Sequence, residues 1–381
     1  MGTSDEAEFT GTSITPMNGP RRLLVGSLLV LLVLLIVKAH IGTIWAMPRA
    51  GVDVEIPLRA AERWLAGGDP YDLTAFESTP GATQPFLYPP FVLPIFAVLT
   101  WLPRMLVLWT AVAVMLVAAI AAIRRLRVPW PWLPLVLAWP PVAEGIVDAN
   151  LAVLMFLAFV VLFFRDSGRP WRPDPRDVSL PSESTVMVGG LATFIGAVKV
   201  SQPHAWLFVL HHRWRAALLG VAAMAVIVIA TLPLTGIDLW VDWIAQLRRA
   251  SEGGWDLGGF ALPRFLPPGV GLVVSVACLV AVWFAPRRDP APWVGILSTV
   301  GSLSLHIFGL LFLIPAMLRI RLEISLAAAC FIATYSYAGA WAGILLVAGA
   351  YAAVTFGGER LASWVAAEPV RAPAEQVKVA P

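Results

Sequence analysis

Charge and cysteine are scarce in this sequence, and each shortage excludes a class of protein. Only 13% of the 381 residues are charged, whereas 59% are hydrophobic. Because soluble globular proteins carry roughly a quarter charged residues, we expect an integral membrane protein with many spans. The small net charge of +3 comes mostly from arginines in short loops. This pattern is typical of residues that set membrane topology and does not indicate a nucleic-acid partner. Cys278 and Cys330 lie inside apolar runs and indicate neither a disulfide framework nor a thiolate metal site.

The sequence also lacks the motifs of nucleotide-dependent and metal-dependent chemistry. No glycine-rich motif precedes Lys-Ser or Lys-Thr, which argues against a P-loop and an ATP-driven machine. The histidines do not combine with Asp or Glu at metal-ligand spacing, and no Ser-His-Asp arrangement indicates a nucleophile. We therefore expect neither a cofactor nor a metal site.

Long apolar runs are abundant, and the arginines between them predict a topology. Assigning the arginine clusters to the cytoplasm follows the positive-inside rule. The first run is long enough to span a bilayer, and no small-residue cleavage site clearly follows it, so we expect a retained helix over 23–45. The sequence predicts about twelve membrane helices in total. The others are expected over 105–123, 131–146, 150–164, 186–198, 202–212, 216–236, 269–285, 291–304, 307–318, 324–339 and 341–356.

One apolar run, 86–102, is expected not to span. Only one net crossing fits between the first helix and the Arg124-Arg125 pair, and prolines are frequent in and just after this run. We predict a partly buried element on the outer side, within a first outer loop over 46–104. One transmembrane domain is expected over 21–360, between polar, disordered cytoplasmic ends at 1–20 and 361–381.

The first outer loop concentrates acidic, aromatic and turn-forming residues between apolar segments. Asp53 and Glu55 follow the first helix, and a carboxylate flanked there by apolar residues would have a raised pKa and make a fair general base. Alternatively, Asp53 only caps a short helix that begins near Ile56. Asp69 lies in a turn, Gly67 to Tyr71, that is expected to end this helix with glycine as its C-cap. Aromatic side chains of this loop suit sugar rings, which makes Tyr71 and Tyr88 candidate substrate contacts.

Three later outer segments carry candidate cations. Lys199 lies in a tight outer turn, against the positive-inside trend, where it would bind a phosphate or extend to lipid headgroups. His204 is close enough to be a second-rank candidate. His306 follows the turn Gly301-Ser302-Leu303-Ser304-Leu305, where it would donate to a phosphate or sugar hydroxyl, or cap a helix. Arg264 ends a loop over 237–267 whose amphipathic start predicts an interfacial helix; these residues would suit a lipid-linked substrate or anchor the membrane.

In this order, these residues resemble the GT-C polytopic glycosyltransferases, and most closely glycosyltransferase family 87 (DUF2029), whose members transfer mannose from a polyprenyl-phosphate carrier. Three stretches carry the resemblance. They are Asp53 followed by Gly67-Gly68-Asp69-Pro70-Tyr71 and Tyr88-Pro89-Pro90; the Lys199 turn leading to His211-His212-Arg213-Trp214-Arg215; and Ser302-Leu303-Ser304-Leu305-His306 before Pro315. The chain departs from the family where Gly-Gln-x-Asn is usual and Val147-Asp148-Ala149-Asn150 stands, and where Pro203 follows the Lys by four residues instead of one.

The resemblance implies a GT-C-like bundle with its active site on the extracytoplasmic side of the plasma membrane. It implies Asp53 as general base, and Lys199 and His306 beside the phosphate of a polyprenyl-phosphate sugar donor. The acceptor would be a glycolipid or lipoglycan, and the transfer would invert the anomeric centre. A transporter or flippase is the alternative from another class, although few ionisable residues lie at mid-span. A non-catalytic assembly subunit is a third interpretation.

Overall fold

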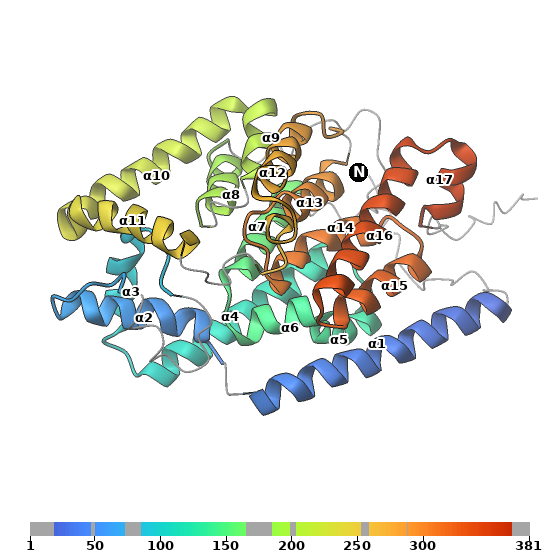
Figure 1. Cartoon of the computed structure of the whole chain (residues 1–381), viewed down its shortest axis with the longest axis horizontal. Helices are drawn as coiled ribbons and strands as arrows, with labels where there is room; N and C mark the ends of the chain where they lie inside the picture. Colours follow the sequence, from blue (N-terminus) through green and yellow to red (C-terminus); the bar gives the residue numbers. More distant parts are fainter. Residues whose placement is uncertain are drawn as a thin grey trace, which may run out of the picture.

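The protein is built from helices throughout the part that a computed structural model describes, namely residues 19–46, 50–72, 85–164, 185–198, 203–252, 259–287 and 289–367. The only strand-like pairings within these ranges are two isolated β-bridges. This confirms the predicted all-α class. Figure 1 shows the helices packed around a central group with one long helix along its edge.

The longest helices coincide with the longest apolar runs. Four helices of the described ranges are long and apolar enough to cross a membrane. They are α1 (Gly19–Ala46), α4 (Arg104–Arg125), α10 (Trp214–Thr235) and α16 (Tyr337–Phe356). A fifth span is possible where α6 (Pro140–Val147) and α7 (Leu151–Phe163) meet at a bend of 119°. These helices identify a membrane protein, whereas the predicted total of about twelve spans is not confirmed.

Shorter apolar helices occupy the other predicted positions and supply much of the core. They are α5 (Leu133–Ala138), α8 (Thr185–Val198), α9 (His204–His212), α12 (Pro268–Trp283), α13 (Pro290–Val300), α14 (Ile314–Met317), α15 (Leu322–Ala333), and the 3-10 helices η3 (Trp130–Trp132) and η5 (Ile307–Leu313). At the centre, the buried ring of Phe312 meets Phe156 and Phe159 edge to face. This aromatic contact fixes η5 against α7, which is almost wholly buried.

A second, smaller hydrophobic core gathers at the left of Figure 1, beside the C-terminal end of α10. It unites α2 (Val52–Leu65), the 3-10 helix η2 (Pro90–Val92), α3 (Leu93–Leu99) and α11 (Asp238–Glu252). The run 86–102 therefore forms only a short helix, as its prolines predict. The amphipathic helix predicted after 237 is α11, which exposes Val241 and Ile244 and packs Trp243 against this core.

The helical domain continues past residue 360. The last helix, α17 (Glu359–Val365), folds back on the start of α15, where Arg321 donates its backbone N–H to the Val365 carbonyl over 2.8 Å. A bridge between Ile320 and Ala366 completes this contact.

Candidate functional site

Asp53 lies in the first turn of α2, and backbone hydrogen bonds join that turn to the end of α6. The helix begins one residue earlier, after the N-cap Gly51, so the interpretation of Asp53 as the cap of a helix starting near residue 56 is wrong. The N–H groups of Gly51 and Asp53 donate to the carbonyls of Val147 and Asp148 over 2.8 and 2.9 Å. Backbone N–H groups at the start of α2, which have no partner within their own helix, are thus paired with backbone carbonyls at the end of α6. Asp53 is half-buried.

Asn150 brings a side-chain amide to Asp53 from the sharp turn between α6 and α7. Its Oδ1 accepts the Ala152 N–H over 2.8 Å, which caps α7, and its Nδ2 donates to Oδ2 of Asp53. Between the two helices, Ala149 adopts a left-handed conformation with φ of 55°. The sequence prediction treated this turn only as a departure from the family pattern. An Asn directly before an apolar helical run is an N-cap signal that marks the turn, although not its partner.

Tyr88 is electrostatically close to Asp53. Burial, and next the negative charge of Asp53, raise the pKa of the half-buried Tyr88 phenol above its ordinary value. Two hydrogen bonds hold the backbone at Leu87 and Tyr88. Tyr71 donates its hydroxyl to the Tyr88 carbonyl, and Trp243 donates Nε1 to the Leu87 carbonyl, each over 2.9 Å. Tyr71 itself is only 1% exposed and stacks on Phe86, so it lies inside the small core.

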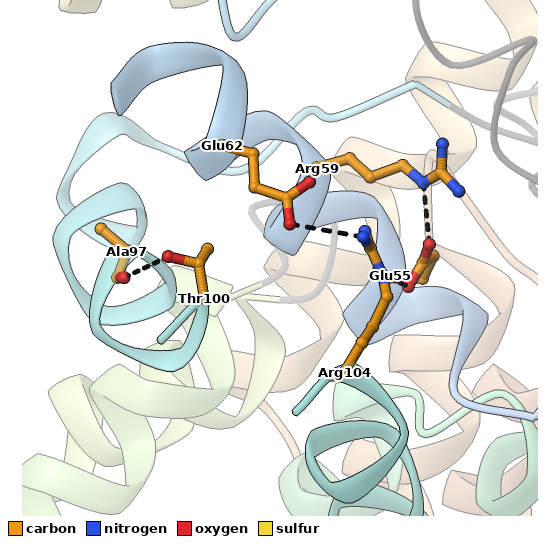
Figure 2. Close-up of polar contacts among 6 residues, drawn as sticks. All are labelled: Glu55, Arg59, Glu62, Ala97, Thr100 and Arg104. Carbon is orange, nitrogen blue, oxygen red and sulfur yellow. Dashed lines mark hydrogen bonds and ion pairs between the residues drawn. The ribbon is translucent and has the colours of Figure 1, made fainter. Parts of the chain in front are cut away.

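Glu55, the second acid of this turn, is occupied by arginines. Figure 2 shows its carboxylate between Arg59 on the same helix and Arg104 at the start of α4, at 2.7 and 2.6 Å. Arg104 also reaches Glu62 over 3.3 Å. These ion pairs tie α2 to α4, which gives the buried Glu55 a structural role.

His306 ends the turn before η5, and a second segment, around Gly259, touches it. Its half-buried ring stacks on Phe308 with centroids 5.6 Å apart, and the side chain does not cap the helix. Leu305 forms a β-bridge with Gly259, which has φ of 52°. A Cβ atom on Gly259 would collide with the Leu305 carbonyl and lie 3.0 Å from Nδ1 of His306. Only glycine therefore fits this contact.

Arg264, in the 3-10 helix η4 (Leu262–Arg264), stands beside the same bridge. Its guanidinium donates to the Gly259 carbonyl over 3.3 Å and lies 4.8 Å from the ring centre of Tyr337. The side chain is exposed. The structure thus brings the predicted cations Arg264 and His306 to one place, although 42 positions separate them in the sequence.

The Asp53 turn and the His306 turn are linked through α6 and η5. Gly145 faces Phe308 so closely that a Cβ atom would lie 3.4 Å from that side chain and 2.7 Å from Val153. This glycine lies just before the Asp148–Asn150 turn, and Phe308 follows His306 by two residues. The packing of Gly145 against Phe308 therefore connects the turn that contacts Asp53 with the turn that carries His306.

His204 lies inside the fold. It is fully buried at the start of α9, and its Nε2 faces Gly301, where a Cβ atom would lie 2.8 Å away. Lys199 lies outside the described residues, between α8 and α9. Among the side chains that the structure does describe, no group of three or more His, Cys, Asp or Glu residues is arranged to hold a metal ion.

A comparison with protein families identifies a matching family. The model of Glycosyltransferase family 87 matches residues 86–307, more than half of the chain. The match contains the Asp148–Asn150 turn and His306, whereas Asp53 precedes it. No curated protein and no solved structure matches the chain.

Proposed function

The chain belongs to glycosyltransferase family 87, and from this membership we propose that it moves mannose from a polyprenyl-phosphate carrier to a hydroxyl of a glycolipid or lipoglycan. The family makes the protein a glycosyltransferase, and its long apolar helices make it a membrane protein. Membership also favours transfer over the transporter interpretation. The identities of donor, sugar and acceptor are our proposal.

One observation carries the assignment of the base. Asp53 is half-buried, not fully buried, and it is hydrogen-bonded to Asn150 and Asp148 in the family-matched part of the chain. The neighbouring Glu55 is buried and paired with two arginines. Of the two acids, we assign the base to Asp53, because the carboxylate of Glu55 is already bound by Arg59 and Arg104.

The proposed reaction is a direct displacement. Asp53 takes the proton of the acceptor hydroxyl as its oxygen forms a bond to the anomeric carbon. The bond from that carbon to the carrier phosphate breaks, and the phosphate leaves with the electron pair. Lys199, His306 and Arg264 stabilise the charge that develops on the phosphate. Attack opposite to the leaving group inverts the anomeric centre, so a β-linked donor yields an α-mannoside.

The aromatic and buried candidates take supporting parts in this proposal. Tyr88, half-buried and within the field of Asp53, lines the sugar site. Tyr71 and His204 act from inside the fold, because both are almost fully buried: Tyr71 holds the Tyr88 segment, and His204 packs behind the turn that leads to His306.

The proposed setting is the plasma membrane, with about twelve membrane-embedded helices and the site on the extracytoplasmic side. The arginine distribution supports this orientation. The exposed apolar stripe of α11, with Val241, Ile244 and Leu247, supports an interfacial position for the small core beside Asp53.

An Asp53→Asn variant tests the proposal most directly. Transfer of lipid-linked mannose by membranes that contain the variant should fall by roughly 10²–10⁴-fold, the usual contribution of a general base. The matched control is Glu55→Gln, the same acid-to-amide change two residues further on, which should retain transfer per folded molecule. Full activity of Asp53→Asn would exclude Asp53 as the base.

A further inference from the structure

We propose that Asn150 is a positioning residue for Asp53: it fixes the orientation of the carboxylate that takes the acceptor proton. The inference rests on the proposed function, in which Asp53 is the base. It concerns a residue 97 positions away along the chain, at the junction of α6 and α7.

The cap of α7 determines which end of the Asn150 amide faces Asp53. The Oδ1 atom accepts the Ala152 N–H over 2.8 Å, so the NH2 group is left on the side of Asp53 and donates to its Oδ2. If the amide were flipped, its NH2 group would face the Ala152 N–H and the cap would be lost. Its oxygen would then face the Asp53 carboxylate, which is unfavourable because both groups are acceptors. The cap of α7 therefore orients the Asn150 NH2 group toward one oxygen of the Asp53 carboxylate.

The backbone around this amide is held equally firmly. Asn150 donates its N–H to the Gly145 carbonyl over 2.9 Å, and Asp53 donates its own N–H to the Asp148 carbonyl over 2.9 Å. Ala149 between them is fully buried in a left-handed conformation that an alanine rarely adopts. Such a conformation persists only where its surroundings determine it, and it is frequent at functional sites.

The geometry gives this contact a consequence for proton transfer. The hydrogen bond to Oδ2 restrains rotation of the carboxylate, so its orientation toward an acceptor hydroxyl is limited before substrate binds. Without the amide, this restraint on the Asp53 carboxylate is lost, and fewer encounters with the acceptor are productive. We expect the loss to appear in kcat and not in the KM for the donor.

Two substitutions separate positioning from capping, because both serine and aspartate are good N-cap residues. Asn150→Ser keeps a cap but removes the amide donor, and it should lower kcat at least tenfold with little change in donor KM. Asn150→Asp also keeps a cap, but it places a second carboxylate against Asp53. Its activity should fall further, and the acidic limb of its pH profile should move to higher pH, because two adjacent carboxylates resist ionising together.

Three other titratable groups that the structure describes near this pair are common to all the variants. Glu55 remains paired with Arg59 and Arg104, Asp148 lies on the same turn, and Tyr88 is the phenol within the field of Asp53. A shift of the acidic limb that is seen in Asn150→Asp and not in Asn150→Ser is therefore due to the new carboxylate.

Folding supplies an independent measurement. Repulsion between the two acids should lower the melting temperature of Asn150→Asp. The double variant Asp53→Asn with Asn150→Asp should recover the wild-type melting temperature, because it again places an amide beside a carboxylate. The exchanged pair should remain inactive, since the carboxylate has moved.

The outcomes distinguish this inference from the proposed function. Wild-type kcat and pH profile in both single variants, beside an inactive Asp53→Asn, would reduce Asn150 to a helix cap and overturn the inference. An unstable Asn150→Asp that the exchange fails to rescue would overturn the contact itself. An active Asp53→Asn would instead overturn the assignment of the base.

Discussion

Arg104 donates from Nε to Oε2 of Glu55 over 2.6 Å and so joins the start of α4 to the first turn of α2. The second oxygen of Glu55 is bonded to Arg59 over 2.7 Å. Two residues earlier, Asp53 is bonded to a neutral amide, that of Asn150. The two acids of this helical turn therefore have different described partners, and the ion pairs of Glu55 join α2 to α4.

Glu55→Gln should lower stability without removing activity. It replaces the acceptor of two arginines, and we expect a loss of about 1–2 kcal/mol, reduced from a fully buried pair because the arginines are partly exposed. Glu62→Gln is the control, since its contact with Arg104 is longer and more exposed and should contribute roughly 0–1 kcal/mol. Thermal unfolding in detergent measures both. An equal loss in the two variants would contradict the importance given to Glu55.

The segment around Tyr88 should depend on two hydrogen bonds, one from Tyr71 and one from Trp243. Tyr71→Phe and Trp243→Phe each keep an aromatic ring but remove one donor to the 87–88 carbonyls, so each should cost about 1 kcal/mol of stability. Trp240→Phe is the matched control on α11. In the part of the chain that the structure describes, the buried Nε1 of Trp240 has no hydrogen-bond partner, so its removal should be neutral. Melting temperatures of the three variants would show the order, and a larger loss in Trp240→Phe than in Trp243→Phe would contradict it.

The positions of the helices were largely predictable from the sequence, because they depend on local properties. Long apolar runs predicted α1, α4, α10 and α16 to within a few residues, and prolines correctly predicted that 86–102 would not form a long helix. The shorter helices lie where expected. Their lengths depend on packing inside the bundle, which composition does not reveal, and the predicted total of about twelve spans is not confirmed.

The contacts of the site were much less predictable, because they join distant segments. Nothing near Asp53 indicates Asn150, and nothing near His306 indicates that Gly259 and Arg264 adjoin it. The burial of His204 was also unforeseen, because its neighbour Gly301 lies almost a hundred residues further along. The preference for Asp53 over Glu55 came from the family resemblance, and the arginine partners of Glu55 now give it a physical reason.

Gly259→Ala should disturb the His306 turn. A methyl group there would collide with the Leu305 carbonyl and approach Nδ1 of His306 to 3.0 Å, and φ of 52° adds roughly 1–2 kcal/mol of strain. We expect transfer activity to fall more than tenfold, together with a lower melting temperature. Gly269→Ala on α12 is the control, since a Cβ atom there meets nothing within 4 Å. Equal activities of the two variants would show that the Gly259–Leu305 contact does not position His306.

Arg264 should contribute to binding of the donor phosphate through both its charge and its shape. The guanidinium is oriented by the Gly259 carbonyl and the face of Tyr337, an arrangement that suits the planar arginine and not the lysine ammonium. Arg264→Ala should therefore raise the KM for the lipid-phosphate donor about tenfold, a loss of roughly 1.4 kcal/mol, and Arg264→Lys should recover only part of it. Because the side chain is exposed, high salt should narrow the difference between wild type and Arg264→Ala. Full recovery by lysine would mean that charge alone matters, and an unchanged KM in Arg264→Ala would remove this residue from the phosphate site.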